Sequence, residues 1–226
     1  MISTQLKFIL AASAVCLALF ERPSTAGVVA FNNFGPNDTY RNEGVWQGTL
    51  FPQEVMSAQR FTPSVSGSLV RLELGLIFHA PASEDTRDIV DELTLSLVAD
   101  VDGKPGTQAL WSQLYVDQSP IEFGHVAGFD VIAGPSLTAD TKYWLISKSP
   151  STGSTPHTWF GALGPHEPSA MQFIRSASGH PLGVWNVFTD SPGLALRVTV
   201  IPEPAAAALM LAASAALLAF RRRTSP

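Results

Sequence analysis

Apolar and polar residues alternate with a period of two through much of the middle of the chain. The pattern is longest over residues 69–78, 93–99 and 194–200, where every second side chain is apolar and most of those between are polar or small. Successive side chains of a β-strand point to opposite faces, so this period is typical of a strand with one buried face. The sequence therefore predicts strands over these three stretches.

Shorter candidate strands are separated by clusters of Gly, Pro, Asn, Asp or Ser, the residues that turns favour. They cover residues 28–31, 58–61, 110–116, 129–132, 143–147, 157–161, 170–175 and 184–188. Many short strands with turn residues between them predict an all-β fold, and we expect an antiparallel β-sandwich of jelly-roll-like form. The charged stretch 82–91 is expected to be a loop.

The first 26 residues have the parts of a secretory signal peptide. Lys7 gives the n-region a positive charge, and residues 8–20 form an apolar h-region. Small residues at Ser24 and Ala26 precede an expected cut between Ala26 and Gly27. The alternative is an N-terminal membrane anchor, but this h-region is shorter than the roughly 20 residues that span a bilayer.

The last 26 residues read as a membrane tail. Its parts, in order, are Pro202, Glu203, Pro204, an apolar run over residues 205–220, and the cluster Arg221, Arg222 and Arg223. The prolines break any helix that continues from the domain. The apolar run predicts a transmembrane helix of about 24 Å, short for a bilayer unless the flanking arginines snorkel. The arginines favour the cytoplasmic side, so we expect the domain outside the cytoplasm.

This tail resembles the PEP-CTERM sorting signal, in which Pro-Glu-Pro precedes a membrane helix and a terminal basic cluster. The resemblance covers residues 201–226. It implies that an exosortase-like membrane protease recognises Pro202, Glu203 and Pro204, cuts near them, and passes the protein to the surface of a Gram-negative bacterium. The alternative is an ordinary tail anchor with a proline-rich stalk, which predicts the same topology without the cut.

Charge and cysteine content narrow the function classes for the central domain. Residues 27–201 carry nine Lys and Arg against seventeen Asp and Glu, a net charge of −8. An acidic surface repels nucleic acid and anionic lipid, so we expect neither as a partner of this domain. The one cysteine, Cys16, lies in the signal peptide, so no disulfide stabilises the mature domain and its core must do so.

The turns of the domain resemble those of the choice-of-anchor domains, and the R-type member is the most similar. The stretches that carry the resemblance are residues 31–36, 58–63, 99–107 and 137–145. The resemblance covers most of the mature domain and implies a β-sandwich in front of a sorting tail. It implies no activity.

Asp100 and Asp102 are the candidate metal ligands. Two carboxylates separated by one residue and followed by Gly103 begin some calcium loops, because Ca²⁺ takes several oxygens that converge on one bend. Lys104 and Pro105 then stand where further ligands would be needed. The favoured interpretation is a hairpin turn, in which Asp and Gly supply the backbone angles. An acidic run over residues 84–92 is a second calcium candidate, interpreted as a solvated loop.

No spacing in the sequence identifies a catalytic centre. The five histidines, His79, His125, His157, His166 and His180, form no zinc-binding pattern. The chain also lacks a Gly-x-Ser-x-Gly elbow, and its many carboxylates offer no way to choose a glycosidase pair. We therefore predict neither a cofactor nor an enzymatic activity, and a secreted hydrolase is the last alternative.

The tryptophans suggest a carbohydrate-binding alternative. An exposed indole stacks on the apolar face of a sugar ring. Trp159 and Trp185 lie in turn-rich stretches and are the expected ligand-stacking residues, whereas Trp144 follows a strand signal and is expected in the core. For each tryptophan the competing interpretation is a packing residue.

The leading hypothesis from the sequence is an exported, surface-sorted, non-enzymatic β-sandwich. It comprises a signal peptide over residues 1–26, the sandwich over 27–200 and the sorting tail over 201–226. Its expected partners are signal peptidase, an exosortase-like protease, the membrane and extracellular polysaccharide. Carbohydrate binding and secreted hydrolysis are the two alternatives.

Overall fold

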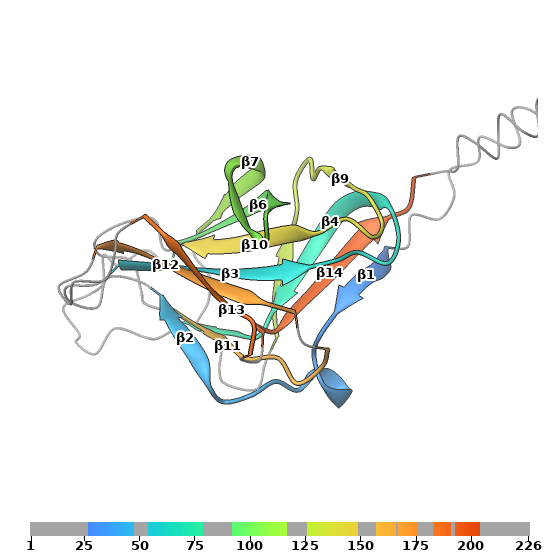
Figure 1. The fold of residues 1–226 in the computed structure, drawn as a ribbon. Coiled ribbons are helices and arrows are strands. Elements are labelled where there is room, and N and C mark those ends of the chain that lie inside the picture. The colour runs from blue at the N-terminus through green and yellow to red at the C-terminus, as the bar shows by residue number, and fades with distance from the viewer. Residues whose placement is uncertain are drawn as a thin grey trace, which may run out of the picture.

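The computed structural model describes residues 27–47, 54–78, 92–116, 126–148, 157–165, 167–175, 183–190 and 193–203 (Figure 1). The predicted signal peptide, the apolar run 205–220 and the loop 82–91 lie outside these ranges. Among the described residues, no helix is long and apolar enough to cross a membrane. These residues form strands and one turn of 3-10 helix, Pro36–Asp38, and every strand pairing is antiparallel.

One sheet contains both chain ends of the domain. Its order is β1 (Val28–Asn32), β14 (Leu196–Ile201), β4 (Gly67–Leu74) and β8 (Ala127–Asp130), and the short β9 (Ser136–Leu137) also pairs with β4. β1 and β14 are neighbours although they are the first and last strands of the chain, and they lie side by side in Figure 1. The ends of the domain therefore leave from one sheet.

A small sheet continues this layer beyond Gly75. It comprises β2 (Gly44–Gln47), β11 (His157–Phe160) and β5 (Leu76–Phe78). Gly75 separates β4 from β5, and its carbonyl accepts a hydrogen bond from the Phe160 amide at 2.8 Å. A Cβ at Gly75 would lie 3.0 Å from the Tyr40 ring. The bare backbone at this position therefore allows the chain to pass from one sheet to the next.

The other layer is a six-stranded sheet. Its order is β13 (Trp185–Phe188), β12 (Ser169–Arg175), β3 (Glu54–Phe61), β10 (Tyr143–Lys148), β6 (Leu93–Val101) and β7 (Lys104–Tyr115). β6 and β7 form a long hairpin whose register shifts near Val98. β13 and β7 are the two edges of this sheet and still come into contact, which shows that the sheet curls.

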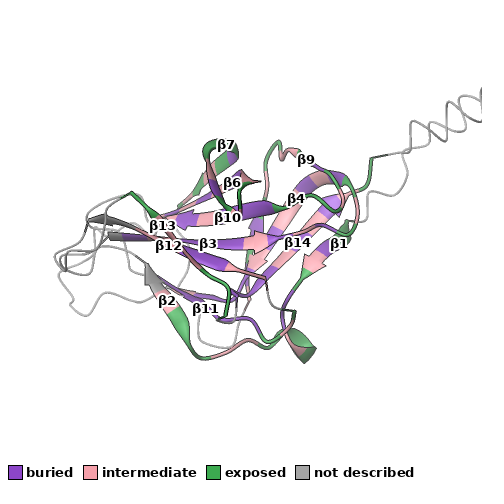
Figure 2. Cartoon of the chain, in the orientation of Figure 1, coloured by how far each residue is buried: buried purple, intermediate pink, exposed green. Residues whose placement is uncertain are grey.

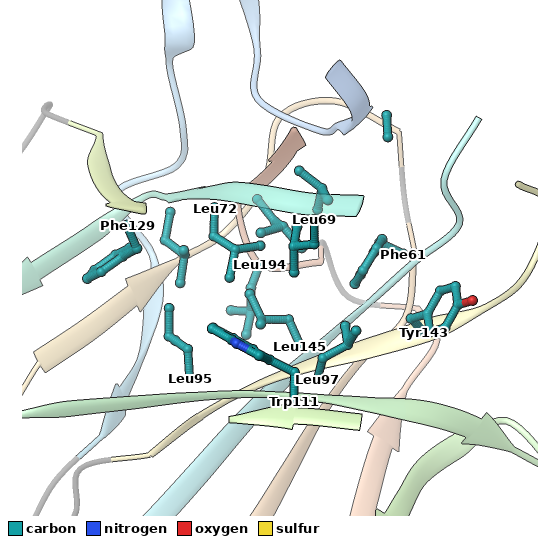
Figure 3. Packing of buried hydrophobic residues seen from close by; sticks show 14 of the residues in the cluster. Phe61, Leu69, Leu72, Leu95, Leu97, Trp111, Phe129, Tyr143, Leu145 and Leu194 are labelled. Carbon is teal, nitrogen blue, oxygen red and sulfur yellow. The ribbon is translucent and has the colours of Figure 1, made fainter. Parts of the chain in front are cut away.

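The main core fills the space between the two layers. In Figure 3, Leu72 and Phe129 from the first layer lie across from Leu95, Leu97 and Trp111 of the six-stranded sheet. Burying one leucine side chain completely stabilises the fold by about 1.5–3 kcal/mol. The buried residues alternate with half-buried ones along β4, β6 and β14, as the period of two in the sequence predicted (Figure 2).

A second, smaller cluster lies on the outer face of the six-stranded sheet. Its fully packed members are Ala58, Val98, Trp144 and Ala170, and partly buried Ile146, Trp185 and Val187 pack against them. Trp144 alternates along β10 with Tyr143 and Leu145, which belong to the main core. The two faces of β10 therefore contribute to two different clusters, which explains why its burial pattern is almost continuous.

The structure confirms the predicted all-β, antiparallel, sandwich-like class. Every stretch predicted as a strand contains one, and the stretch 69–78 contains two because Gly75 interrupts it. The pattern missed the four-residue β2 and also β9, whose two residues are too short to show a period. These elements are specified by their neighbours in space, since β2 pairs with β11 and β9 with β4.

Candidate functional site

Asp100 lies at the end of the hairpin that β6 and β7 form, and both oxygens of its carboxylate accept hydrogen bonds from other residues of the protein. Asp102 and Gly103 have φ angles of 52° and 78°, the left-handed values that a two-residue type I′ turn requires. The Gly103 amide donates to Asp100 Oδ1 at 3.0 Å, and Trp144 Nε1 donates to Asp100 Oδ2 at 2.8 Å. The hairpin interpretation is therefore confirmed, and Asp100 links this turn to the outer cluster.

The described residues do not gather a metal site. Among them, no group of three or more His, Cys, Asp or Glu could hold a metal ion. Of the acidic run 84–92, the structure describes Glu92, and of the five histidines it describes His157. The remaining members of both sets lie outside the described residues.

Three tryptophan side chains in the described ranges are buried. Trp144 is 0% exposed, as predicted. The expected exposure of Trp159 is wrong, because this side chain is also 0% exposed and its Nε1 donates to the Ala195 carbonyl at 2.8 Å. Trp111 is buried too, and its Nε1 donates to the Ile132 carbonyl at 3.2 Å. Trp159 sits on the central strand of the small sheet, where the main core covers it, so it presents no face to a ligand.

Trp185 differs from these three because it is only half-buried. It lies on β13 opposite Gln172 of β12, on the outer face of the six-stranded sheet. β13 is an edge strand, so the indole has fewer neighbours than a residue in the middle of the sheet. Of the two tryptophans predicted to stack on a ligand, Trp185 is therefore the one that reaches the surface.

Ser147 and His157 form a contact that the sequence did not single out. Ser147 Oγ lies 3.2 Å from His157 Nε2, and both residues are completely buried. Ser57, which faces Ser147 across β3 and β10, has a buried hydroxyl without a hydrogen-bond partner in the structure. The pair lies in the interior between the six-stranded and small sheets, so it does not present a nucleophile to solvent.

Charged residues form ion pairs across the outer face of the first layer. Arg197 pairs with Glu73 at 3.3 Å and with Asp38, and Arg71 pairs with Asp130 at 2.7 Å. Burial would lower the pKa of Arg197, but the hydrogen bonds and charges of Asp38 and Glu73 outweigh it and raise that pKa. The arginine therefore stays charged, and these partly exposed pairs tie β14, β4 and β8 together with a modest gain in stability.

The residues next to the two predicted cuts lie together at one end of the sandwich. A Cβ at Gly27 would lie 2.5 Å from Thr199 Cγ2, which places the first described residue against β14. Ile201 is the last residue of β14, and Pro202 and Glu203 follow it at the surface. Ser136 Oγ donates to Glu203 Oε1 at 2.6 Å. Pro204 and Arg221, Arg222 and Arg223 lie outside the described residues.

The sequence analysis singled out Glu203 but not Ser136. Nothing local marks Ser136, because its contact with Glu203 joins residues 67 positions apart and depends on the pairing of β9 with β4. No protein-family model matches the chain, and no curated protein matches it either. The function is therefore inferred from the residues of this chain alone.

Proposed function

We propose that this protein is an exported, surface-sorted β-sandwich that works without catalysis. Signal peptidase removes residues 1–26, and an exosortase-like membrane protease cuts near Pro202, Glu203 and Pro204. Before the second cut, the helix over residues 205–220 holds the chain in the inner membrane, with Arg221, Arg222 and Arg223 in the cytoplasm. The mature jelly-roll-like domain is then displayed at the cell surface or in the extracellular polysaccharide matrix.

The position of the two cuts relative to the outermost strands carries this proposal. Ala26 and Gly27 lie just before β1, and Pro202 lies just after β14. β1 and β14 are paired neighbours in one sheet. Removing both tails therefore leaves every described strand and the whole main core intact. If both tails are targeting signals that are removed, the remaining domain must keep its fold without them.

The composition of the mature domain agrees with an extracellular destination. Its net charge of −8 favours solubility and opposes binding to anionic lipid once the tail is gone. It has no cysteine, so its stability does not depend on the redox state of the compartment. The main core and the six-stranded sheet supply that stability instead.

The variant Glu203→Ala tests the sorting step in the native host. We expect the variant to keep its C-terminal tail and to remain in the membrane fraction, because the motif has lost its carboxylate. Asp190→Ala removes an exposed carboxylate away from the motif and should be processed like the wild type. Release of Glu203→Ala at the wild-type rate, with the same mass, would refute recognition of this motif.

A second candidate function is carbohydrate binding, and the half-buried indole of Trp185 favours it. Its neighbour across the strand pair is Gln172, whose amide can bond sugar hydroxyls. An apolar ring beside a polar side chain matches the two kinds of surface that a sugar presents. The site would lie on the outer face of β12 and β13, away from the sorting motif.

Titration with soluble polysaccharides, followed by tryptophan fluorescence, tests this candidate. A ligand that stacks on Trp185 should change the emission, and Trp185→Ala should abolish both the change and the binding. Phe188→Ala is the matched control, because Phe188 is an exposed aromatic residue of the same strand that points to the opposite face. An unchanged emission across a broad set of glycans would eliminate this function.

A further inference from the structure

The sorting motif begins without any spacer after a strand of the core. Ile201 pairs with Ser68 of β4 in the last register position of β14. Pro202 passes so close to Gly67 that a Cβ at Gly67 would lie 2.4 Å from the Ile201 carbonyl oxygen and 3.0 Å from Pro202 Cα. A side chain at position 67 would displace this segment. The glycine therefore allows the start of the motif to lie against β4.

Glu203 is then held by a residue from another part of the fold. Its Oε1 accepts a hydrogen bond of 2.6 Å from Ser136 Oγ. Ser136 belongs to β9 and pairs with Ser68, the same residue that pairs with Ile201. Ser136, Ser68 and Ile201 therefore lie in a row across three strands. This row exists only after β9, β4 and β14 have come together, so it is a property of the folded domain.

We propose that Gly67 and Ser136 form a dock for Pro202 and Glu203, and that the folded domain thereby withholds its own sorting motif. The inference rests on the proposed function, in which a membrane protease reads Pro202, Glu203 and Pro204. A protease must surround the segment that it cuts, but the Glu203 carboxylate is bound to Ser136 and Ile201 is part of a sheet. The enzyme then acts on the fraction of molecules whose segment has left the dock, and its apparent affinity falls with that fraction.

Docking gives the domain control over the time of its release. A chain that has folded keeps its motif docked most of the time and stays anchored for longer. A chain whose end of β14 is frayed or unfolded exposes the motif. The cut is therefore slower for a folded domain than for an unfolded one.

The rate of tail removal in the native host, followed by pulse-chase, tests the dock through Ser136, which is outside the motif. Ser136→Ala removes the donor, and loss of one hydrogen bond to a carboxylate predicts roughly two- to tenfold faster removal. Ser136→Asp places a second negative charge beside Glu203 and should be at least as fast. Ser136→Thr keeps a hydroxyl and should restore the slow rate.

Ser112→Ala is the matched control for these variants. Ser112 shares an exposed hydrogen bond with Ser96 on the six-stranded sheet, whereas the tail contact lies on the other sheet. Its removal costs the domain one surface hydrogen bond without touching Glu203, so the rate should equal that of the wild type. Equal rates for Ser136→Ala and Ser112→Ala would overturn the dock.

Hydrogen exchange of the uncut full chain in detergent separates the dock from the sorting step. The amides of Thr199, Val200, Ile201 and Glu203 should exchange faster in Ser136→Ala than in Ser112→Ala. If no variant is cut in the host while this difference is present, the dock stands and the proposed sorting function fails. If cutting proceeds while exchange and rate are the same in both variants, sorting stands and the dock fails.

Discussion

The main core and the outer cluster contain the same kinds of residue but bury them to different extents. The main core lies between two layers, so it encloses Trp159 and pairs the indole N–H with the Ala195 carbonyl. The outer cluster lies on one face of a curled sheet, so it encloses Trp144 but leaves Trp185 half-buried at the edge. Trp144 and Trp185 share this face, but Trp144 is on β10 inside the sheet and Trp185 is on the edge strand β13. The comparison teaches that cover by a second layer or by neighbouring strands, rather than the nearby turn residues, decides whether a tryptophan is buried or accessible.

The largest expected effect separates the two regions directly. Trp159→Ala should lower the free energy of unfolding by about 3–5 kcal/mol, because it opens a cavity in the main core and removes a buried hydrogen bond. Trp185→Ala should cost about 1 kcal/mol or less, since water already reaches that indole. Urea or guanidinium unfolding of the two variants measures both values. Equal losses would show that the outer cluster is as closed as the main core.

The difference between these two tryptophans also shows where sequence reasoning stops. The alternation over residues 93–99 and 194–200 predicted buried strands because one face of each strand meets the core along its whole length. Trp159 was expected at the surface because it lies in a turn-rich stretch, but all four residues of β11 are buried. The small sheet buries one face of β11 against the main core, and Tyr40 stacks on Phe160 on the other.

The candidate sites also contain some features that the sequence could predict and others that it could not. The hairpin at Asp102 and Gly103 could be predicted because its left-handed backbone angles depend on the types of these two residues. The partners of Asp100 and Glu203 could not be predicted. Trp144 and Ser136 reach them across 44 and 67 residues, and only the strand order brings them together.

A middle-sized effect is expected where the hairpin meets the outer cluster. Asp100→Ala leaves the indole N–H of fully buried Trp144 without its acceptor, which should cost about 1–3 kcal/mol. Asp102→Asn changes an exposed residue of the same turn, keeps a residue type that tolerates the left-handed φ, and should cost less. Thermal unfolding with and without Ca²⁺ should give the same Tm, since both oxygens of Asp100 already accept protein hydrogen bonds. A Ca²⁺-dependent rise in Tm that Asp100→Ala abolishes would restore the metal site.

The smallest expected effect is a loss of stability at high pH that involves Tyr115, at the rim of the main core. Burial, with a smaller contribution from the charge of Asp130, raises the pKa of Tyr115 to about 12. Tyrosines of the unfolded chain lose their protons at about pH 10, so the contribution of Tyr115 to the free energy of unfolding is fully present below that pH. It is lost as pH rises toward 12, because the unfolded state then releases a proton that the folded state keeps. Tyr115→Phe should lessen the fall in stability between these pH values, and an unchanged pH profile would contradict the assignment.

The most direct test of the account is the intact mass of the protein recovered from the membrane, surface and medium fractions of its native host. The account predicts a mass that begins at Gly27 and ends near Pro202–Pro204, in the surface or medium fraction, with the longer form confined to the membrane. Recovery of a single species that still carries residues 205–226, found only in the inner membrane, would contradict surface sorting. The protein would then be a tail-anchored domain that remains outside the cytoplasm but never reaches the matrix.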